Sequence, residues 1–280
     1  MTVALGIREA AEVLAQVSDT PRLDAELLVA HVLGVSRTTM LLGMMTDPVP
    51  AGIAALVLRR LKHEPVAYIV GSQNFFGREF AVDAGVLIPR ADSETTVAVA
   101  LDACPAPRRV LDCGVGSGAL LLTVLAERRG AAGVGIDRSS AAIEIAGKNA
   151  MALDIEGDWA MQLADWSHPD WAADLGTFDL ILANPPYVED TAELEPQVRD
   201  HEPAGALFAG PDGLDAYRLL IPQLPAILES DGVAVLEIGS AQAPAVTALA
   251  AAAGFSATLH RDLGDRPRAL ALTFKKALGK

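Results

Sequence analysis

The sequence predicts an α/β protein in which a small helical bundle and a β-hairpin linker precede a seven-stranded, mostly parallel sheet. Two observations predict this fold. Beyond Arg108, short apolar runs typical of strands alternate with helical segments, which implies a parallel sheet covered by helices on both faces. Before residue 65, apolar residues recur at helical spacing instead. A chain of 280 residues is long enough for one large and one small domain.

The first 64 residues are expected to form a helical domain. Four apolar residues near the N-terminus share one helical face: Ile7, Ala10, Ala11 and Leu14. A second helix, Arg22–Leu33, follows the predicted cap Thr20 and stops at Gly34. Its predicted apolar face consists of Leu23, Leu27, Ala30 and Val32. Residues 51–63 supply a third apolar face before Pro65.

Residues 65–90 are expected to form a β-hairpin linker. The β-type runs Val66–Val70 and Phe80–Val82 lie on either side of a turn near Gly77.

Residues 91–280 are expected to form the sheet domain. Its predicted strands are Val110–Cys113, Gly133–Asp137, Trp159–Asp165, Phe178–Ala183, Val233–Ile238, Ser256–Arg261 and Ala269–Phe274. Its predicted helices are Ala119–Arg129, Ser140–Ala152, Leu214–Leu228 and Ala243–Ala252. The last two strands are joined too tightly for a crossover helix, so we expect them to be antiparallel.

The overall composition excludes several classes of protein. A net charge of −14 argues against direct, non-specific nucleic-acid binding, which depends on neutralising phosphates. No apolar stretch approaches the roughly 18–20 residues needed to span a bilayer, and the charged residues within Met1–Gln16 argue against a signal peptide. We therefore expect a cytoplasmic protein without membrane contact. Cys104, Cys113 and five scattered histidines form neither a disulfide framework nor a metal-ligand pattern, so no metal is expected.

A glycine-rich loop follows the first predicted strand of the sheet and begins a helix. Glycines at alternate positions allow close approach of a cofactor to the backbone, where a Cβ atom would clash. A dinucleotide fingerprint needs a further glycine at position 119, which is Ala119, so the loop favours S-adenosyl-L-methionine. The alternative is a purely structural tight turn. The expected cofactor contacts are Asp112, Gly114, Val115, Gly116, Ser117 and Gly118. Cys113 is interpreted as buried packing.

Acidic residues end the next two predicted strands. Asp137, about 20 residues beyond the glycine loop, is placed to accept the ribose hydroxyls. Asp165 is predicted to accept the adenine amine, and Trp166 to cover a ring face.

An Asn-Pro-Pro-Tyr sequence follows the fourth predicted strand, at the sheet edge where ligands bind in open α/β folds. Asn184 and the carbonyl of Pro185 provide two acceptors for an NH2 group, and two prolines remove backbone donors. Tyr187 is expected to pack on a planar acceptor group. The alternative is a rigid loop without chemistry. The expected catalytic residues are Asn184, Pro185, Pro186 and Tyr187, with Asn184 also near the cofactor.

These residues together resemble a known family over nearly the whole chain. It is the family of bacterial glutamine N5-methyltransferases that modify class I peptide chain release factors, the PrmC or HemK proteins. The matching segments are Arg22–Leu28, Glu64–Gly71, Phe75–Gly77, Leu87–Arg90 with Asp92 and Glu94, the glycine loop, Asp137, Asp165 with Trp166, Asn184–Tyr187, Glu202 with Pro203, Ala206 with Leu207, and Asp212–Leu214.

The resemblance implies a Rossmann-like class I SAM-methyltransferase domain with a helical domain that helps to dock the release factor. It implies that the substrate is the glutamine of a Gly-Gly-Gln loop, with Asn184–Tyr187 holding its amide and Gly114–Gly118, Asp137 and Trp166 contacting the cofactor. We expect a monomer. Two positions depart from the family pattern: Val115 replaces a usual threonine, and His201 replaces a usual phenylalanine. Arg90 is as compatible with a salt bridge as with an active-site role.

Three other functions remain open at this stage. A glutamine methyltransferase acting on a ribosomal protein shares both motifs. An adenine-N6 DNA methyltransferase uses the same amine cradle but must extrude its base and bind phosphates, which the acidic charge disfavours. A glycine-rich binding module without catalysis is the alternative that is not an enzyme.

Overall fold

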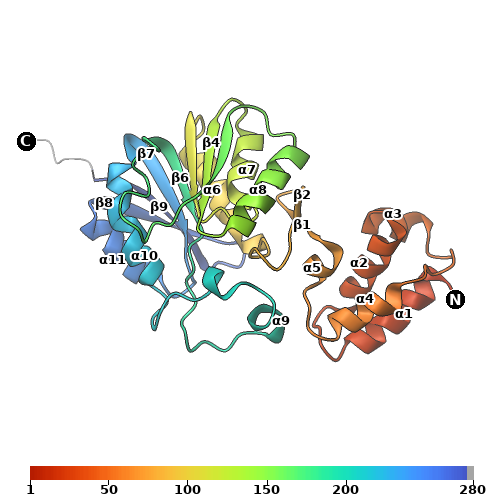
Figure 1. Cartoon of the computed structure of the whole chain (residues 1–280). Helices are drawn as coiled ribbons and strands as arrows, with labels where there is room; N and C mark the ends of the chain where they lie inside the picture. Colours follow the sequence, from red (N-terminus) through yellow and green to blue (C-terminus); the bar gives the residue numbers. More distant parts are fainter. Residues whose placement is uncertain (276–280) are drawn as a thin grey trace, which may run out of the picture. The chain divides into compact units, whose positions relative to one another are not determined.

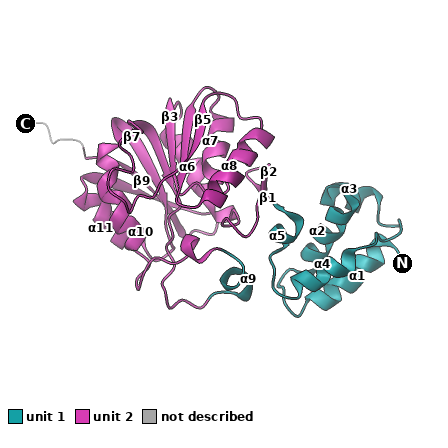
Figure 2. Ribbon diagram, viewed as in Figure 1, with its two compact units in different colours: residues 1–72, 194–202 teal, residues 73–193, 203–280 magenta. Residues whose placement is uncertain are grey.

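The computed structural model describes residues 1–275 and divides the chain into two compact units (Figure 2). The first unit combines Met1–Ser72 with Leu194–Glu202, and the second combines Gln73–Glu193 with the chain from Pro203 onward. The predicted division into a helical domain, a linker and a sheet domain, with boundaries after residues 64 and 90, stays a prediction. The inclusion of Leu194–Glu202 in the helical unit was not expected, because this segment follows the Asn-Pro-Pro-Tyr sequence.

The first unit is helical (Figure 1). Its helices are α1 (Val3–Leu14), α2 (Pro21–Leu33), α3 (Arg37–Gly43), α4 (Ile53–Arg60), α5 (Val66–Val70) and α9 (Pro196–Arg199). The Thr2 hydroxyl accepts the Leu5 N–H at the start of α1, and Gly34 ends α2 in the left-handed conformation, with φ 67°. Within residues 1–275 no single helix is long and apolar enough to cross a membrane, although the bent pair Pro21–Leu33 and Arg37–Gly43 passes by length and composition.

The predicted apolar face of α2 was correct only in part: Ala30 is buried, and Leu27 and Val32 are half-buried. Leu23 is 41% exposed, whereas Asp24 and Glu26 are buried. Arg60 donates to Asp24 at 2.7 Å, and Glu26 pairs with Arg37 at 2.6 Å. Buried ion pairs therefore determine which face of α2 points inward, because burying either carboxylate without its partner is costly. Thr20 lies at the N-cap position of α2 and Pro21 in its first turn, as predicted, but the Thr20 hydroxyl bonds the Asp24 carboxylate and makes no cap bond to the backbone.

The linker hairpin forms, but with a different first strand. It consists of β1 (Ser72–Phe75) and β2 (Arg78–Ala81). Phe76 and Gly77 both have positive φ, of 50° and 74°, as a two-residue hairpin turn requires. The turn near Gly77 was therefore predicted correctly, whereas Val66–Val70 is the helix α5 and not a strand. Pro65 before this apolar run and Gly71 after it suit a single helical turn equally well.

The second unit contains the predicted seven-stranded sheet, in the order β5-β4-β3-β6-β7-β9-β8. Strands β5, β4, β3, β6 and β7 are parallel, and β9 is antiparallel to both β7 and β8, which confirms the expected closing pair. The strands are β3 (Arg109–Cys113), β4 (Ala132–Asp137), β5 (Trp159–Leu163), β6 (Phe178–Ala183), β7 (Leu228–Glu237), β8 (Phe255–Arg261) and β9 (Pro267–Phe274).

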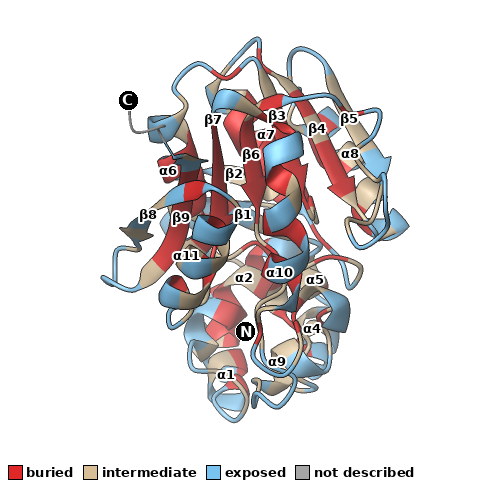
Figure 3. Ribbon diagram, turned by 90° about the vertical axis from the view of Figure 1, so that its left-hand side faces the viewer, coloured by how far each residue is buried: buried red, intermediate tan, exposed pale blue. Residues whose placement is uncertain are grey.

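Helices cover both faces of this sheet, and its strands β3, β6, β7 and β9 are buried along most of their length, whereas the edge strands β5 and β8 are not (Figures 1 and 3). On β3, Val110 packs into the cluster that contains α6, α7 and α8, and its neighbour Leu111 packs into the cluster that contains α10 and α11. This alternation follows from the two-residue period of a strand. The helical segments are η1 (Ala91–Ser93), α6 (Glu94–Ala103), α7 (Ala119–Glu127), α8 (Ser140–Ala152), η2 (Ala204–Ala206), α10 (Asp215–Leu220), η3 (Ile221–Ala226) and α11 (Ala243–Ala252).

One predicted helix is shorter in the structure. The segment expected as Leu214–Leu228 is the helix α10 followed by the 3-10 turn η3, because Pro222 and Pro225 cannot donate helical hydrogen bonds. The strand order leaves β3 between β4 and β6, which lead away in opposite directions. The carboxyl ends of these three strands therefore form the switch point at which open α/β sheets bind ligands.

Candidate active site

A cavity of about 390 Å³ opens at this switch point, entirely within the second unit. Its walls come from the loops after β3, β4, β5 and β6, from the segment around η1, and from residues 203–219. Of the predicted site residues, those lining the cavity are Asp112, Gly114, Val115, Gly116, Ser117, Asp137, Asp165, Trp166, Asn184 and Pro186. Gly118, Pro185 and Tyr187 are not among the lining residues.

The glycine loop is fastened to the neighbouring strand and has left-handed backbone at its glycines. The N–H groups of Gly114 and Val115 both donate to the carbonyl of Ile136, at 2.9 and 2.8 Å. A Cβ on Gly118 would meet Leu122 at 2.7 Å, whereas a Cβ on Gly116 would meet no protein atom within 4 Å. Gly118, with φ 87°, therefore packs closely on Leu122, and Gly116 leaves free space beside the cavity.

Asp112 is a buried carboxyl group with an unused oxygen. The residue is 1% exposed; Oδ2 accepts the Leu121 N–H at 3.2 Å, and Oδ1 has no partner. Burial raises the pKa of Asp112 to about 7. Since unpaired buried polar atoms are costly, the arrangement suits a cationic or donating group bound in the cavity. Burial also raises the pKa of the adjacent Cys113 thiol, which keeps it protonated and unreactive.

Asp137 ends β4 and shapes the glycine loop. Its Oδ2 accepts the Gly116 N–H at 3.0 Å, and its Oδ1 accepts the Ser139 N–H at 2.9 Å. Each oxygen keeps a second lone pair for a hydroxyl donor.

Asp165 and Trp166 were expected at the end of a strand, but β5 ends at Leu163. Asp165 lies in the following loop, where the Ser167 N–H donates to it at 2.8 Å and lowers its pKa. This local turn competes with further strand pairing, which explains the earlier end of β5. The Trp166 ring packs closely against the glycine loop: a Cβ atom on Gly114 would lie 3.2 Å from the ring.

Asn184 follows β6 directly and lines the cavity beside Pro186. Its Nδ2 lies 3.4 Å from the Ser93 hydroxyl oxygen, to which it donates. Tyr187 packs against the apolar cluster under α10 and α11, and its burial raises the pKa of Tyr187 to about 12. The Tyr187 carbonyl accepts a hydrogen bond from Gln242 Nε2 at 3.0 Å, which anchors the loop from the back.

Four residues of this region were not found from the sequence: Ser93, Asn149, Glu237 and Gln242. Asn149 is 1% exposed, and its Nδ2 donates to the carbonyls of Ser117 and Ala81 at 2.8 and 3.0 Å. It therefore joins the glycine loop to the linker hairpin. Asn149, Glu237 and Gln242 are polar residues in mainly apolar segments, and that isolated polarity is their only sequence signal, whereas Ser93 lies between Asp92 and Glu94 and carries no such signal.

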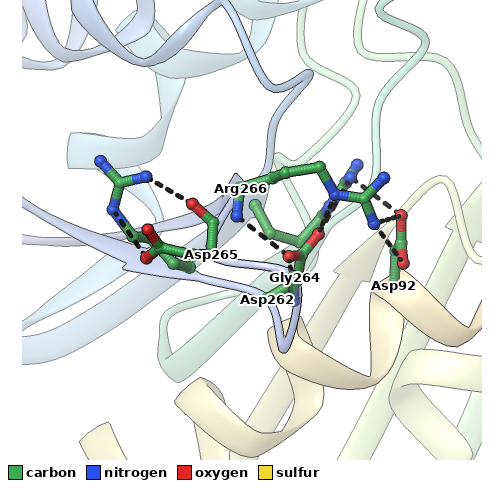
Figure 4. A network of polar contacts seen from close by, with 7 residues as sticks. Asp92, Asp262, Gly264, Asp265 and Arg266 are labelled. Atoms are coloured by element: carbon green, nitrogen blue, oxygen red, sulfur yellow. Dashed lines mark hydrogen bonds and ion pairs between the residues drawn. The ribbon is translucent and has the colours of Figure 1, made fainter.

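A charged network supports the wall of the cavity near η1 (Figure 4). Asp92 binds Arg266 at 3.3 Å and Arg268 at 2.9 Å, and Arg266 also binds Asp262. The network links η1 to the β8–β9 turn. Arg90 lines the cavity, and both of its predicted roles, a salt bridge and an active-site role, remain predictions.

The two departures from the family pattern lie in different units. Val115 is 4% exposed and packs against Gly135, where a Cβ would meet it at 2.7 Å. His201 Nε2 lies 3.1 Å from the Lys62 carbonyl oxygen, within the helical unit.

Two family models match the chain. The PrmC N-terminal domain matches residues 7–71, and the methyltransferase small domain matches residues 89–200.

Curated relatives match most of the chain. A release factor glutamine methyltransferase of Rhodospirillum rubrum is 40% identical over 93% of this chain and 81% of its own length. The protein of the same name from Caulobacter vibrioides is 42% identical over 84% of this chain and 83% of its own length. The protein of the same name from Geobacter sulfurreducens is 38% identical over 85% of this chain and 84% of its own length.

Solved structures share the fold. A ribosomal protein methylase of Lactobacillus delbrueckii subsp. bulgaricus superposes with a TM-score of 0.52 at 24% identity, covering 73% of this chain and 90% of its own. A T. thermophilus 16S rRNA methyltransferase, in complex with AdoMet and guanosine, superposes with a TM-score of 0.51 at 19% identity. The match covers 73% of this chain and 50% of the other.

Proposed function

The chain belongs to the release factor glutamine methyltransferases, and we propose that it methylates the glutamine side-chain amide in the Gly-Gly-Gln loop of class I peptide chain release factors. S-adenosyl-L-methionine is the proposed methyl donor. The observation that carries this proposal is that Asn184 lines the same cavity as Asp112, Gly116 and Asp137. An amide-binding group and a set of cofactor-binding groups therefore share one enclosed space.

The residues of the cavity fit this cofactor. The unpaired Oδ1 of Asp112 is available to the amino group of its methionine part, and the free lone pairs of Asp137 to the ribose hydroxyls. The open space at Gly116 admits the cofactor close to the backbone. When bound, S-adenosylmethionine supplies an electrophilic methyl group on a positively charged sulfur.

The acceptor side requires orientation more than acid–base chemistry. An amide nitrogen is a weak nucleophile, because its lone pair is delocalised into the carbonyl group. The side-chain oxygen of Asn184, which lines the cavity, accepts one N–H of the amide and directs its lone pair towards the donor side. The Pro185 carbonyl, expected as the second acceptor, does not belong to a residue that lines the cavity. Such near-attack positioning contributes on the order of 7–11 kcal/mol in well-oriented systems. The transfer forms one N–C bond, breaks one S–C bond and releases one amide proton.

The competing substrates are less well supported. A net charge of −14 opposes the phosphate contacts that a DNA methyltransferase requires. The curated relatives over most of the chain carry release factors in their names, whereas the ribosomal protein methylase is similar in fold alone.

The proposal is tested by incubating the enzyme with S-adenosylmethionine labelled in its methyl group. Release factor, release factor with the Gly-Gly-Gln glutamine changed to alanine, total ribosomal protein and duplex DNA serve as parallel acceptors. We expect label on the unchanged release factor alone. Label that persists on the alanine form, or that appears instead on DNA or ribosomal protein, contradicts the proposal.

A further inference from the structure

A short polar chain leads from the cavity into the interior behind Asn184. Asn184 Nδ2 donates to the Ser93 hydroxyl oxygen at 3.4 Å, and both residues line the cavity. Ser93 in turn hydrogen-bonds the Glu237 carboxylate, at the end of β7. Ser93 is 4% exposed and Glu237 is 1% exposed, so water does not compete strongly for either group.

The surroundings of Glu237 determine which way the Ser93 hydroxyl proton points. Burial raises the pKa of Glu237 to about 7, so above this pH the group is an ionised carboxylate, which only accepts hydrogen bonds. One of its oxygens, Oε2, has no partner. The Tyr217 hydroxyl donates to the backbone carbonyl of Glu237 and not to its carboxylate. Nη2 of the nearby Arg268 donates to Asp92 and Asp262. The side chains that hydrogen-bond the carboxylate are the hydroxyls of Ser93 and Thr96, so the Ser93 proton points to Glu237 when this carboxylate is ionised.

With its proton used in this way, Ser93 offers only lone pairs to Asn184. A lone pair binds the NH2 end of a side-chain amide and not its oxygen. The oxygen of Asn184 is then left for the cavity. If the amide were flipped, the cavity would present a donor to a substrate that is itself a donor.

We propose that Ser93 is a positioning residue that holds the Asn184 side-chain amide with Nδ2 inward and Oδ1 towards the cavity, as the acceptor for an NH2 group of the substrate. This inference rests on the proposed function, because it assigns the acceptor atom for an amide substrate. The Asp92–Arg268 and Asp92–Arg266 pairs fix the η1 turn on which Ser93 lies (Figure 4).

The first arm of the test is kinetic. Ser93→Ala removes the lone pair, and we expect kcat with release factor to fall about tenfold, as for the loss of one orienting hydrogen bond. The Kd for S-adenosylmethionine should stay within about twofold, because the donor side is untouched. Ser93→Thr keeps the hydroxyl and should restore most of kcat. The matched control is Thr123→Val, which removes a buried hydroxyl that has no partner and does not line the cavity.

The second arm does not require turnover. The chain has only three asparagines, Asn74, Asn149 and Asn184, so protein labelled with ¹⁵N-asparagine gives three side-chain NH2 signals. The Asn184 signal is the one lost in Asn184→Ala. We expect Ser93→Ala to move this signal and to leave the Asn74 and Asn149 signals in place.

The two arms separate failure of this inference from failure of the proposed function. If wild-type enzyme does not methylate release factor, the proposed function fails, and the NMR arm alone decides the Ser93–Asn184 contact. An unmoved Asn184 signal in Ser93→Ala overturns the inference, whatever the kinetics show. So does an unchanged kcat in Ser93→Ala when the wild type is active.

Discussion

The carboxylate of Asp137 accepts the backbone N–H of Gly116 at 3.0 Å. This bond joins the end of β4 to the middle of the glycine loop after β3. Asp137 therefore shapes the loop before any ligand arrives, and its remaining lone pairs face the same cavity. One side chain thus couples the shape of the cofactor loop to cofactor binding.

Removal of the Asp137 carboxylate is expected to weaken S-adenosylmethionine binding. Asp137→Ala loses both the loop contact and the ribose acceptor, and hydrogen bonds to charged groups contribute about 1.5–3 kcal/mol. We predict a Kd that is about 10- to 100-fold higher by isothermal titration calorimetry. Asp102→Ala, which removes an exposed carboxylate on α6, should leave the Kd unchanged. Equal affinities in the two variants would remove Asp137 from the cofactor site.

A methyl group at Gly116 is expected to block the cofactor without unfolding the protein. Gly116→Ala places Cβ in free space at φ 53°, a conformation that costs an L-residue roughly 1–2 kcal/mol. Gly34→Ala is the matched control, because φ is 67° there, no atom lies within 4 Å of the new Cβ, and Gly34 belongs to the helical unit. We predict similar small decreases in Tm for both variants and lost cofactor binding for Gly116→Ala alone. Retained binding in Gly116→Ala would show that the cofactor does not approach this position.

The affinity for S-adenosylmethionine is expected to depend on the ionisation of Asp112. Its pKa of about 7 means that the carboxyl is protonated in the free protein at lower pH, and a protonated carboxyl does not attract an ammonium group. We predict that the Kd rises about tenfold for each pH unit below 7. It should also rise above about pH 8, where an α-amino group loses its proton. Asp112→Asn should bind S-adenosylmethionine more weakly, and its Kd should no longer rise below pH 7. If the Kd of this variant still rises below pH 7, another group causes the rise.

The same pKa has a consequence for stability, with a definite sign. A carboxyl whose pKa is raised in the folded state binds its proton more tightly there than in the unfolded chain. Its contribution is therefore full below about pH 4 and is lost as the pH rises through about 7. Glu237, whose pKa burial also raises to about 7, acts in the same direction. Urea unfolding measures the free energy of unfolding at pH 5 and at pH 7. Its decrease from pH 5 to pH 7 should be smaller for Asp112→Asn than for the wild type, and an equal decrease would contradict this assignment.

Asn184 is expected to act on the acceptor and not on the cofactor. Asn184→Ala removes the oxygen that orients the substrate amide, and the loss of one such preorganised hydrogen bond typically lowers kcat by about 10²–10³-fold. Calorimetry should show a nearly unchanged Kd for S-adenosylmethionine. Parallel loss of cofactor binding and turnover would mean that the loop serves the donor side.

The sheet was predictable from the sequence because its signals are local. The strand β6, Phe178–Ala183, is apolar apart from Asp179 and is followed by Asn184, and such a run indicates a buried strand by itself. The glycine loop is likewise defined by its own residues, so its place after β3 follows directly.

The remainder depends on partners that are distant in sequence. Asp24 is buried because Arg60 reaches it, across 36 positions, and no periodicity of α2 contains that information. The contact between Ser93 and Asn184 spans 91 positions and joins two polar residues with no shared pattern. The helix α5 was missed because its five apolar residues suit a strand as well as a helical turn.

The central claim is that the cavity directs one NH2 group at a methyl donor, and the modified atom itself tests it most directly. Release factor incubated with enzyme and S-adenosylmethionine is digested, and the Gly-Gly-Gln peptide is sequenced by tandem mass spectrometry. We predict one added methyl group, located on the glutamine side chain, in the wild-type reaction and none with Asn184→Ala. A methyl group on any other residue, or an unmodified peptide after full incubation, would contradict the account.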